Sequence, residues 1–533
     1  MATSLASPPS LEAVRGDRQR RQRGFAALLV TALTMLAVAV HGYHPYAEDG
    51  GVYLPEIKRL LRPELYPQGA EYVVGHLRFS IFPQMMAVLV RASHMSVEMV
   101  LLLAHLASFW TTLFAAWLLA ERCFASRVAR SGAVALLAVW ITLPIAGTSL
   151  MLMDPYVTAR SFSTPCGLLA MVGALDFLLP QYGTAAERRR GLAVCFGALA
   201  AAAVMHPLMA AYALGCVLVL GCVMSGRRQV QVWGTLALCA TAIAVAGALQ
   251  MTAPQENEAY RVVVITRYYW FLSQWHWYEW LGLAAPLTIL AVIGFGGRSF
   301  RRREANDAAR VGLARTAVVA GGTAVAVAVL FARENLTTHL VARLQPLRIF
   351  QVVYVVMILM VGAVLAERVL QRSAMRWVVT FSLLAGVMVV VDQQTFPASA
   401  HVELPGRSGV AENAWEQAFV WISRNTPNDA VFALDAHYIT SKGEDAQGFR
   451  AIAERSVLPD YSKDGGVVAN RPAVTAAWMA GVKAQTNLNT ETDAARMAAL
   501  RPLGADWVVL DRGAKTGFRC DYANDVVKVC RLR

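Results

Sequence analysis

Residues 25–61, FAALLVTALTMLAVAVHGYHPYAEDGGVYLPEIKRLL, hold the pattern that decides the fold. The run 25–41 is apolar and suits a helix that crosses the hydrocarbon core of a bilayer, which takes about 20 residues. The basic segment RGDRQRRQR precedes this run, and the polar stretch HGYHPYAEDGG follows it. We predict a membrane span that leads into an exposed loop. A cleaved signal peptide is the alternative, but the run is longer than a usual signal-peptide core and favours a retained anchor.

The same pattern recurs along most of the chain. Of the 533 residues, 56% are hydrophobic and 16% are charged, which excludes a disordered chain, a disulfide-rich miniprotein and a collagen-like repeat. We therefore predict a polytopic α-helical membrane protein whose constant partner is the lipid bilayer. Its eleven predicted spans are 25–41, 97–120, 131–146, 163–180, 191–204, 207–223, 232–250, 280–297, 313–331, 346–366 and 377–392.

Basic residues set the predicted orientation. If the apolar stretch 79–94 does not cross the membrane, the segments on the same side of the membrane as the N-terminus hold 22 Lys or Arg against 7 Asp or Glu. That excess marks a cytoplasmic side and accounts for the formal net charge of +13. We therefore place 79–94 in or on the outer face of the membrane. Because the surplus charge lies in short cytoplasmic loops, it does not indicate a nucleic-acid partner.

Three regions follow from these boundaries. Residues 1–24 are expected to form a disordered cytoplasmic leader, and residues 25–392 a transmembrane domain with a long first external loop, 42–96. Residues 393–533 are expected to fold as an external soluble α/β domain, periplasmic or extracellular, of a protein of the plasma (inner) membrane. Helical periodicity falls at 411–424, 473–485 and 491–500, and the strand-like runs are AVFALDA, DWVVLD and DVVKVCRL.

Cysteine placement agrees with this topology. Cys520 and Cys530 are the two cysteines of the C-terminal segment, and the other six fall in or beside predicted spans. An oxidising compartment would let Cys520 and Cys530 form a disulfide, although two unpaired thiols are the alternative.

The acidic pair Glu48 and Asp49 is the first candidate site. The two acids lie in a glycine-containing turn just outside the first span, before an amphipathic stretch around 52–61. A carboxylate in a partly desolvated cavity at this depth can act as a general base toward a hydroxyl, or can hold a divalent cation. A solvated turn before a helix N-terminus is the simpler alternative.

The order of these features resembles the GT-C class of membrane glycosyltransferases. The resemblance consists of a first span, a long external loop with an acidic pair, many further spans and an external C-terminal α/β domain. It implies a sugar donor linked to polyprenyl phosphate, a glycan, lipid or protein acceptor, and catalysis in the cell envelope at the outer face. It also implies that Asp49, with Glu48 beside it, acts as base or as ligand of a divalent cation such as Mg or Mn. No WWDYG-type motif occurs in the C-terminal segment, so the chain departs from the oligosaccharyltransferase branch.

A lipid phosphate would need cations on the same face. Arg160 lies in MDPYVTARSFSTP beside Asp154, and Arg343 and Arg348 lie in ARLQPLRIF, where the chain re-enters the membrane. Interfacial arginines bind phosphate in a bidentate manner, but they also extend toward lipid head groups or pair with nearby acids such as Asp154.

Aromatic and histidine residues supply further candidates. Residues 268–280, YYWFLSQWHWYEW, could stack on sugar rings through residues such as Trp275, with Glu279 and His276 nearby, or could form an aromatic belt at the membrane interface. His44 and His76 share the first external loop with the acids and are candidates on that ground.

Two other classes of function remain open. A transporter or lipid flippase is disfavoured, because the spans carry almost no central ionisable groups and no two halves look alike. A non-catalytic scaffold whose external domain recruits a partner is the third hypothesis.

Overall fold

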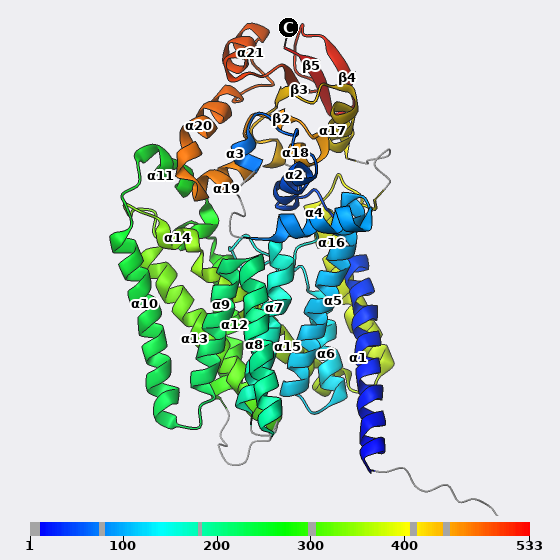
Figure 1. Cartoon of the computed structure of the whole chain (residues 1–533), viewed down its shortest axis with the longest axis vertical. Coiled ribbons are helices and arrows are strands. Elements are labelled where there is room, and N and C mark those ends of the chain that lie inside the picture. Colours follow the sequence, from blue (N-terminus) through cyan, green and yellow to red (C-terminus); the bar gives the residue numbers. More distant parts are fainter. Residues whose placement is uncertain are drawn as a thin grey trace, which may run out of the picture.

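The computed structural model describes residues 11–73, 80–179, 184–296, 305–405, 413–440 and 448–532, and of residues 11–23 and 305 the backbone alone. Its long helices form an upright bundle, and a smaller cap built mainly from the C-terminal segment lies on one end of it (Figure 1). The C-terminus lies in the cap, at the end of the molecule farthest from the bundle.

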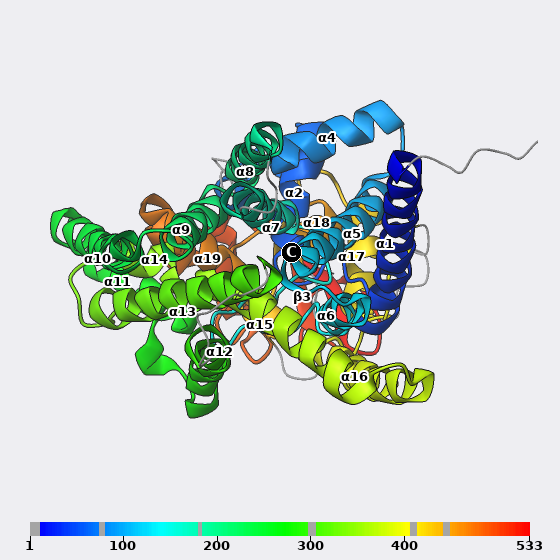
Figure 2. The same cartoon turned by 90° about the horizontal axis from the view of Figure 1, so that it is seen from below.

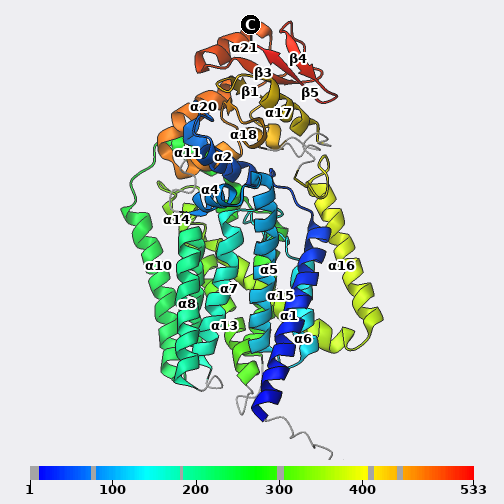
Figure 3. The same cartoon turned by 45° about the vertical axis from the view of Figure 1, so that its right-hand side comes forward.

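Eight helical segments of the described chain are long and apolar enough to cross a membrane. They run side by side in two views of the bundle (Figures 1 and 3). Viewed from below, α10, α12 and α16 lie at the edge of the bundle, whereas α7 and α15 lie nearer its centre (Figure 2). The segments are α1 (Leu11–His41), α5 (Val97–Cys123), α7 (Ala159–Leu178), η1 with α10 (Val230–Gly234, Thr235–Thr252), α12 (Trp277–Phe295), α13 (Ala305–Phe331), α14 to η5 and α16 (Ala374–Thr395).

The segment from α14 to η5 is a broken helix. It comprises α14 (Leu340–Leu344), η4 (Pro346–Ile349), α15 (Phe350–Leu365) and η5 (Ala366–Leu370). The break falls at Gln345, whose φ of 50° is left-handed, directly before Pro346. A proline removes a backbone donor and disfavours helix at the preceding residue, which explains why the helix restarts here.

Three other predicted spans contain helices that do not meet both criteria. α9 (Pro207–Val223) has 17 residues, and α8 (Ala185–Met205) has 21 but carries Arg188, Arg189 and Arg190 near its start. α6 (Arg127–Val139) has only 13 residues, so the predicted span 131–146 is too long. The chain turns after Trp140, and Pro144 pairs with Met151 in an isolated bridge. The proline at 144 explains the early end, because helices seldom continue up to a proline.

The N-terminal leader also differs from expectation. α1 begins at Leu11, so residues 11–24 continue the helix of the first span instead of forming a disordered leader, and residues 1–10 lie outside the described residues. The segment LEAVRGDRQRRQR is rich in Arg, Gln, Glu, Leu and Ala, which are all favourable in helices.

Two short helices of the first loop lie across the end of the bundle. α2 (Gly50–Leu61) and α4 (Phe82–Ser93) each have 12 residues, and α3 (Ala70–Val73) lies between them. A 12-residue helix is about 18 Å long and cannot span a hydrocarbon core of about 30 Å. α4 lies nearly perpendicular to the long helices (Figures 1 and 3).

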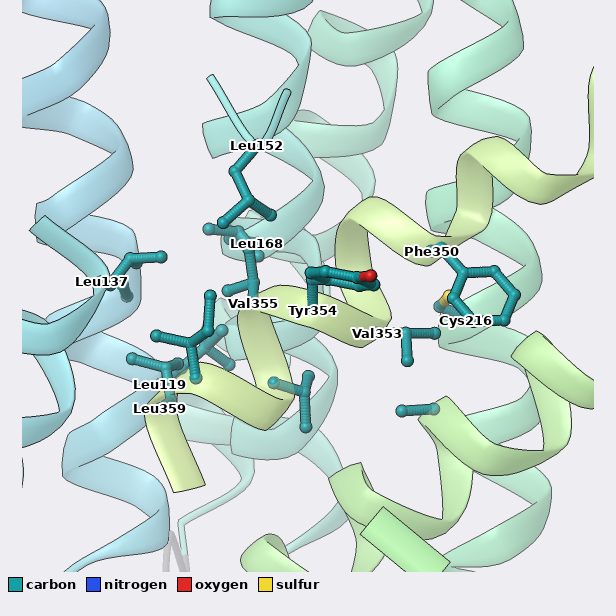
Figure 4. Packing of buried hydrophobic residues seen from close by; sticks show 14 of the residues in the cluster. Leu119, Leu137, Leu152, Leu168, Cys216, Phe350, Val353, Tyr354, Val355 and Leu359 are labelled. Atoms are coloured by element: carbon teal, nitrogen blue, oxygen red, sulfur yellow. The ribbon is translucent and has the colours of Figure 1, made fainter. Parts of the chain in front are cut away.

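Packing within the bundle uses close helix contacts. Leu119 of α5, Leu137 of α6, Leu168 of α7 and Leu359 of α15 belong to one buried cluster (Figure 4). Where α6 crosses the junction of α15 and η5, a Cβ on Gly132 would lie 2.2 Å from the Cβ of Ala366. Small residues permit such close approach, which is a main source of helix association where lipid replaces water.

The cap contains one mixed five-stranded sheet of order β2-β1-β3-β5-β4. β2, β1 and β3 are parallel, and β5 and β4 are antiparallel additions at one edge, where a disulfide joins Cys520 to Cys530. The prediction of a helical chain with a small C-terminal α/β part is confirmed. The strands are β1 (Val431–Ala433), β2 (Ser456–Val457), β3 (Trp507–Asp511), β4 (Cys520–Ala523) and β5 (Val527–Arg531), and the helices are α17 (Ala414–Asn425), α18 (Phe449–Ala453), α19 (Lys463–Asn470), α20 (Thr475–Ala484) and α21 (Asp493–Leu500).

The first loop and the C-terminal segment share one hydrophobic core. Tyr53 and Ile57 of α2 belong to the same buried cluster as Phe419 and Phe449 of the C-terminal segment. Polar contacts reinforce this junction, because Lys58 Nζ donates to the Ala451 carbonyl at 2.8 Å. The loop 42–96 is therefore packed into the cap, which brings Glu48 and Asp49 against residues some 400 positions later in the chain.

Candidate active site

Asp49 lies at the start of α2 and turns its carboxylate away from that helix. It is the N-cap residue, and its backbone carbonyl accepts from the amides of Val52 and Tyr53 at 3.0 and 3.1 Å. Its side chain makes no capping hydrogen bond. An aspartate at this position ordinarily accepts from the first-turn amides. Here the carboxylate instead contacts two basic side chains, Arg160 and Lys463.

The glycines after Asp49 let the cap approach this turn. A Cβ on Gly51 would lie 2.8 Å from the carbonyl oxygen of Tyr46 and 3.0 Å from the Cα of Gly448. Both distances are shorter than a side chain tolerates, so the close contact between the first loop and the cap requires glycine. Glu48, just before, has a left-handed φ of 49°. The turn thus holds the two acids beneath the cap.

Arg160 connects Asp49 to a buried acid. It lies in the first turn of α7, with Nη1 3.2 Å from Asp49 Oδ2 and Nη2 2.9 Å from Asp154 Oδ2. Arg160 and Asp154 are both buried. Burial raises the pKa of the Asp154 carboxyl, and the nearby Asp49 adds to that increase, against the opposing attraction of Arg160. A buried cation held between two acids is kept charged and fixed in position.

Lys463 reaches the acidic pair from the cap. It is the first residue of α19, and its Nζ forms an ion pair with Glu48 and lies 3.6 Å from Asp49 Oδ1. Burial disfavours the ammonium, but the two acids outweigh it and raise the pKa of Lys463 above its ordinary value. Two acids of the first loop therefore face two cations, one from the bundle and one from the cap.

Arg348 belongs to the same electrostatic cluster. It lies in η4 at the break before α15, within electrostatic range of Arg160 and Asp49. Its Nε is buried and has no hydrogen-bond partner among the residues that the structure describes. Asp154 and Tyr53 also interact electrostatically with Arg348. A guanidinium with an unpartnered N–H beside a second arginine is suited to bind a phosphate.

Two tyrosines complete the surroundings. Burial raises the pKa of Tyr53, which lies in α2 close enough for Arg160 and Asp49 to act on it. Tyr269 lies in η2 (Tyr268–Trp270) and interacts electrostatically with both Lys463 and Arg348. One end of the aromatic stretch 268–280 therefore faces the candidate site.

The rest of that stretch has other contacts. Glu279 accepts from the His276 amide at 2.7 Å and caps the N-terminus of α12. Trp275 is buried, and its ring lies against Gly147 beside Glu279. Trp277 is 75% exposed, as an aromatic belt at a membrane interface requires. Glu279 thus caps the N-terminus of α12, and Trp275 packs against Gly147. Neither side chain has a contact with Asp49 among the described residues.

The remaining candidates also lie elsewhere. The ring of His44 contacts Glu403 at 3.0 Å and Asp392 at 3.4 Å, and it stacks on Phe396. This cluster fixes the end of α1 to the segment after α16. Arg343 donates to the Tyr260 hydroxyl at 3.3 Å. His76 lies outside the described residues.

The acidic pair fits a divalent cation poorly. Across the described ranges, no three His, Cys, Asp or Glu side chains are grouped so as to hold a metal ion. Glu48 and Asp49 are the only acids proposed for such a role, and Lys463 contacts both of them. A cation bound between the two would meet this ammonium and the Arg160 guanidinium. We therefore derive no step through a metal.

Lys463, Tyr53 and Tyr269 were not predicted from the sequence. Lys463 lies in YSKDGG, which has no motif spacing, and its contact with Glu48 joins residues 415 positions apart. The residues around Lys463 begin a helix, and nothing in that local sequence indicates a partner so far away in the chain. The aromatic stretch 268–280 was itself a predicted candidate. Its sequence did not indicate that Tyr269, among its many aromatic residues, would face the site.

Comparison with known proteins adds no identity to this geometry. No protein-family model matches the chain, and no curated protein matches it.

Proposed function

We propose that the chain is an integral membrane glycosyltransferase of the GT-C type, which transfers a sugar from a polyprenyl-phosphate donor to an acceptor hydroxyl. The observation that carries this proposal is the ion pair of Asp49 with Arg160 where the cap contacts the helical bundle, with Arg348 within electrostatic range of both. Asp49 lies 3.2 Å from Arg160, and Arg348 interacts electrostatically with both residues. This arrangement supports the proposal, because a carboxylate can act as a base for an acceptor hydroxyl and neighbouring cations can stabilise a phosphate.

A pocket within the bundle supports a lipid-linked donor. Its empty space of about 340 Å³ includes open solvent, and it is lined by residues of α7, α9, η4 and α15, Arg348 among them. Leu168, Met209, Val352 and Val355 give it apolar walls. A prenyl chain is apolar and its phosphate is anionic, so a pocket that combines these walls with an arginine matches both parts of the donor.

The proposed reaction is a displacement at the anomeric carbon of the donor. The Asp49 carboxylate accepts the proton of the acceptor hydroxyl while the acceptor oxygen bonds to the anomeric carbon. The bond between that carbon and the phosphate oxygen breaks, and its electron pair leaves with the polyprenyl phosphate. Arg348 and Arg160 stabilise the charge that develops on the departing phosphate. Lys463 and Arg160 compensate the charge of the acidic pair in the resting state.

The proposed setting is the plasma (inner) membrane, with a cytoplasmic N-terminus and the cap on the periplasmic or extracellular face. The α5–α6, α9–α10 and α15–α16 connections lie at the end of the bundle opposite the cap (Figures 1 and 3). Basic residues lie in or directly beside these connections, including Arg127, Arg228 and Arg372. Excess Lys and Arg in short loops is typical of the cytoplasmic side, which supports placing the cap outside.

The direct test is transfer of a labelled sugar from polyprenyl phosphate by membranes that contain the protein. Asp49→Asn preserves the size of the side chain and removes its basicity, and removing a general base typically costs about 10²- to 10⁴-fold in rate. Glu64→Gln is the matched control, because Glu64 is an exposed acid of the same loop. Loss of transfer in Asp49→Asn alone supports the assignment, and full activity of that variant contradicts it.

Arg348→Gln tests the phosphate role separately. We expect lower transfer with a raised KM for the lipid-linked donor, because a charged partner of the phosphate is lost. Arg343→Gln is its control, since Arg343 lies in the same segment but contacts Tyr260. Equal kinetics for the two arginine variants would contradict the role of Arg348. Donor flipping by the purified protein in vesicles, without transfer of sugar, would instead support the flippase alternative.

A further inference from the structure

An open pocket lies between the first loop and the C-terminal part of the cap, and its empty space of about 480 Å³ includes open solvent. One wall comes from the turn before α2, from α2 and from α3, and includes Glu48 and Tyr72. The other wall comes from the C-terminal segment and includes Arg450, Asp460 and Lys463. Because Glu48 and Lys463 also belong to the candidate active site, a ligand in this pocket would lie next to Asp49.

Two buried donors in the pocket have no partner within the described part of the chain. Tyr72 is only 4% exposed and its hydroxyl is buried, and Arg450 is 9% exposed with a buried Nε. The Arg450 guanidinium lies over the Tyr72 ring, 5.6 Å from its centroid. Buried polar atoms in native proteins are almost always hydrogen-bonded. Two unpartnered donors lining one pocket therefore point to an acceptor supplied by a ligand.

Two carboxylates of this pocket are held rigidly. Asp464 binds Arg450 through two hydrogen bonds of 2.8 and 3.0 Å, and it accepts from the Asp460 amide at 2.9 Å. Asp460 accepts from the Lys463 amide at 2.6 Å. These bonds fix the acids in place and leave lone pairs that can accept from hydroxyl groups, since each carboxylate offers about four acceptor positions.

The composition of the walls narrows the class of ligand. Glu48, Asp460 and Asp464 face two cations, Arg450 and Lys463, so the pocket offers no excess of positive charge to an anion. Tyr72, Tyr438 and Phe449 contribute aromatic surface. Donors, acceptors and aromatic rings without net cationic character are suited to a neutral polyhydroxyl compound, whose hydroxyls both donate and accept.

We propose that this pocket binds the acceptor substrate as a neutral saccharide, which it presents to Asp49 from the side of Glu48. The role as acceptor site rests on the proposed glycosyltransferase function, whereas binding of the saccharide does not. Tyr72 donates its hydroxyl to a sugar oxygen, and Asp460 accepts from a sugar hydroxyl. The cap thus supplies the acceptor specificity, and the bundle supplies the donor site.

The test is saccharide binding by the full chain in lipid nanodiscs, without donor. The probes are methyl glycosides and trisaccharides of neutral hexoses and pentoses, with inorganic phosphate and glucuronate as anionic comparators, and binding is followed by ligand-observed NMR and by tryptophan fluorescence. We expect saturable binding of a neutral sugar and weak or no binding of both anions. Tyr72→Phe should lower the affinity for the sugar roughly 3- to 10-fold, which is the effect of one lost hydrogen bond.

A matched variant separates binding from folding. Tyr66 is a fully buried tyrosine of the same loop whose hydroxyl donates to the Arg450 carbonyl at 2.7 Å. Tyr66→Phe should lower thermal stability and leave sugar affinity unchanged, whereas Tyr72→Phe should lower affinity and leave stability unchanged. Asp460→Asn, which keeps one carbonyl acceptor, should also lower the affinity for the sugar.

The outcomes distinguish this inference from the proposed function. Equal sugar affinity of wild type and Tyr72→Phe, absence of saturable binding for every neutral probe, or equally tight phosphate binding each overturns the neutral-saccharide site. Asp49→Asn should keep the sugar affinity and lose transfer. If Asp49→Asn keeps transfer while Tyr72→Phe loses sugar binding, the result contradicts Asp49 as the base but supports the saccharide site.

Discussion

Lys463 of the cap approaches Asp49 of the first loop, with its Nζ 3.6 Å from Oδ1, and forms an ion pair with the adjacent Glu48. The contact joins the C-terminal segment to the turn that follows the first span. One of the cationic partners of Glu48 and Asp49 therefore comes from the cap and not from the bundle. The cap is therefore part of the candidate active site, which argues against a merely recruiting role for it.

Replacing Lys463 should reduce transfer without unfolding the cap. Lys463→Met removes the ammonium that holds Glu48 and Asp49, and loss of such a charge-assisted contact corresponds to about a 10- to 100-fold drop in kcat/KM. Transfer kinetics in membranes measure the effect. Lys483→Met, at an exposed position of α20, is the control and should retain full activity. Unchanged kinetics in Lys463→Met would remove the cap from the mechanism.

Asp154 should matter for stability more than for chemistry. It lies 2.9 Å from the buried Arg160, and both side chains are at least 94% shielded from solvent. Asp154→Asn leaves a buried guanidinium with a weakened partner, and breaking a buried ion pair costs about 3 kcal/mol. The melting temperature in detergent should fall clearly.

Removing both charges of this pair should cost less than removing one. The double variant Asp154→Leu with Arg160→Met replaces the pair by apolar side chains of similar size, which is often close to neutral for stability. We expect its melting temperature to lie above that of Asp154→Asn, although transfer is lost with Arg160. A double variant that is less stable than the single one would show that the pair itself stabilises the fold.

Local patterns in the sequence predicted much of the fold. Helical periodicity indicated α17, α20 and α21, and the alternating apolar runs indicated β3 and β5. β2 was missed because two residues are too few to show a period. The acidic turn was identifiable because glycines, acids and the end of an apolar run are all local features.

Contacts across the chain account for what the sequence did not show. His44 shares a loop with Asp49, which suggested a common site, but Gly42 has a left-handed φ of 70° and His44 packs on Asp392 and Glu403 instead. The partners of Tyr72 and Glu48 lie in the cap, hundreds of residues away. Such pairings depend on how the cap docks, which no local pattern records.

His44 should give the protein a pH-dependent stability. Burial lowers the pKa of the imidazole, but the hydrogen bonds and charges of Asp392 and Glu403 outweigh burial and raise it to about 9. The folded pKa thus exceeds the ordinary histidine value of 6.5, so the folded state holds the proton more tightly than the unfolded one. The stabilisation is complete below pH 6.5 and is lost as the pH rises through about 9.

Thermal unfolding at several pH values checks this dependence. The melting temperature of the wild type should fall between pH 6.5 and about 9, and His44→Gln should be less stable at low pH with a flatter profile. His94→Asn is the control, because His94 is exposed at the end of α4 and its left-handed conformation is tolerated by Asn. The assignment fails if His44→Gln retains the pH dependence of the wild type.

Transfer should proceed without an added divalent cation. A metal ion between Glu48 and Asp49 would lie against the Lys463 ammonium, which contacts both acids, and near Arg160, which lies 3.2 Å from Asp49. Chelator should therefore leave the transfer rate of the wild type unchanged, and added Mg²⁺ or Mn²⁺ should not raise it. Lys463→Ala provides the internal comparison, because it exposes two neighbouring carboxylates and should gain a response to Mg²⁺ or Mn²⁺ that the wild type lacks. A wild-type enzyme that is inactivated by chelator and restored by the metal would contradict this prediction.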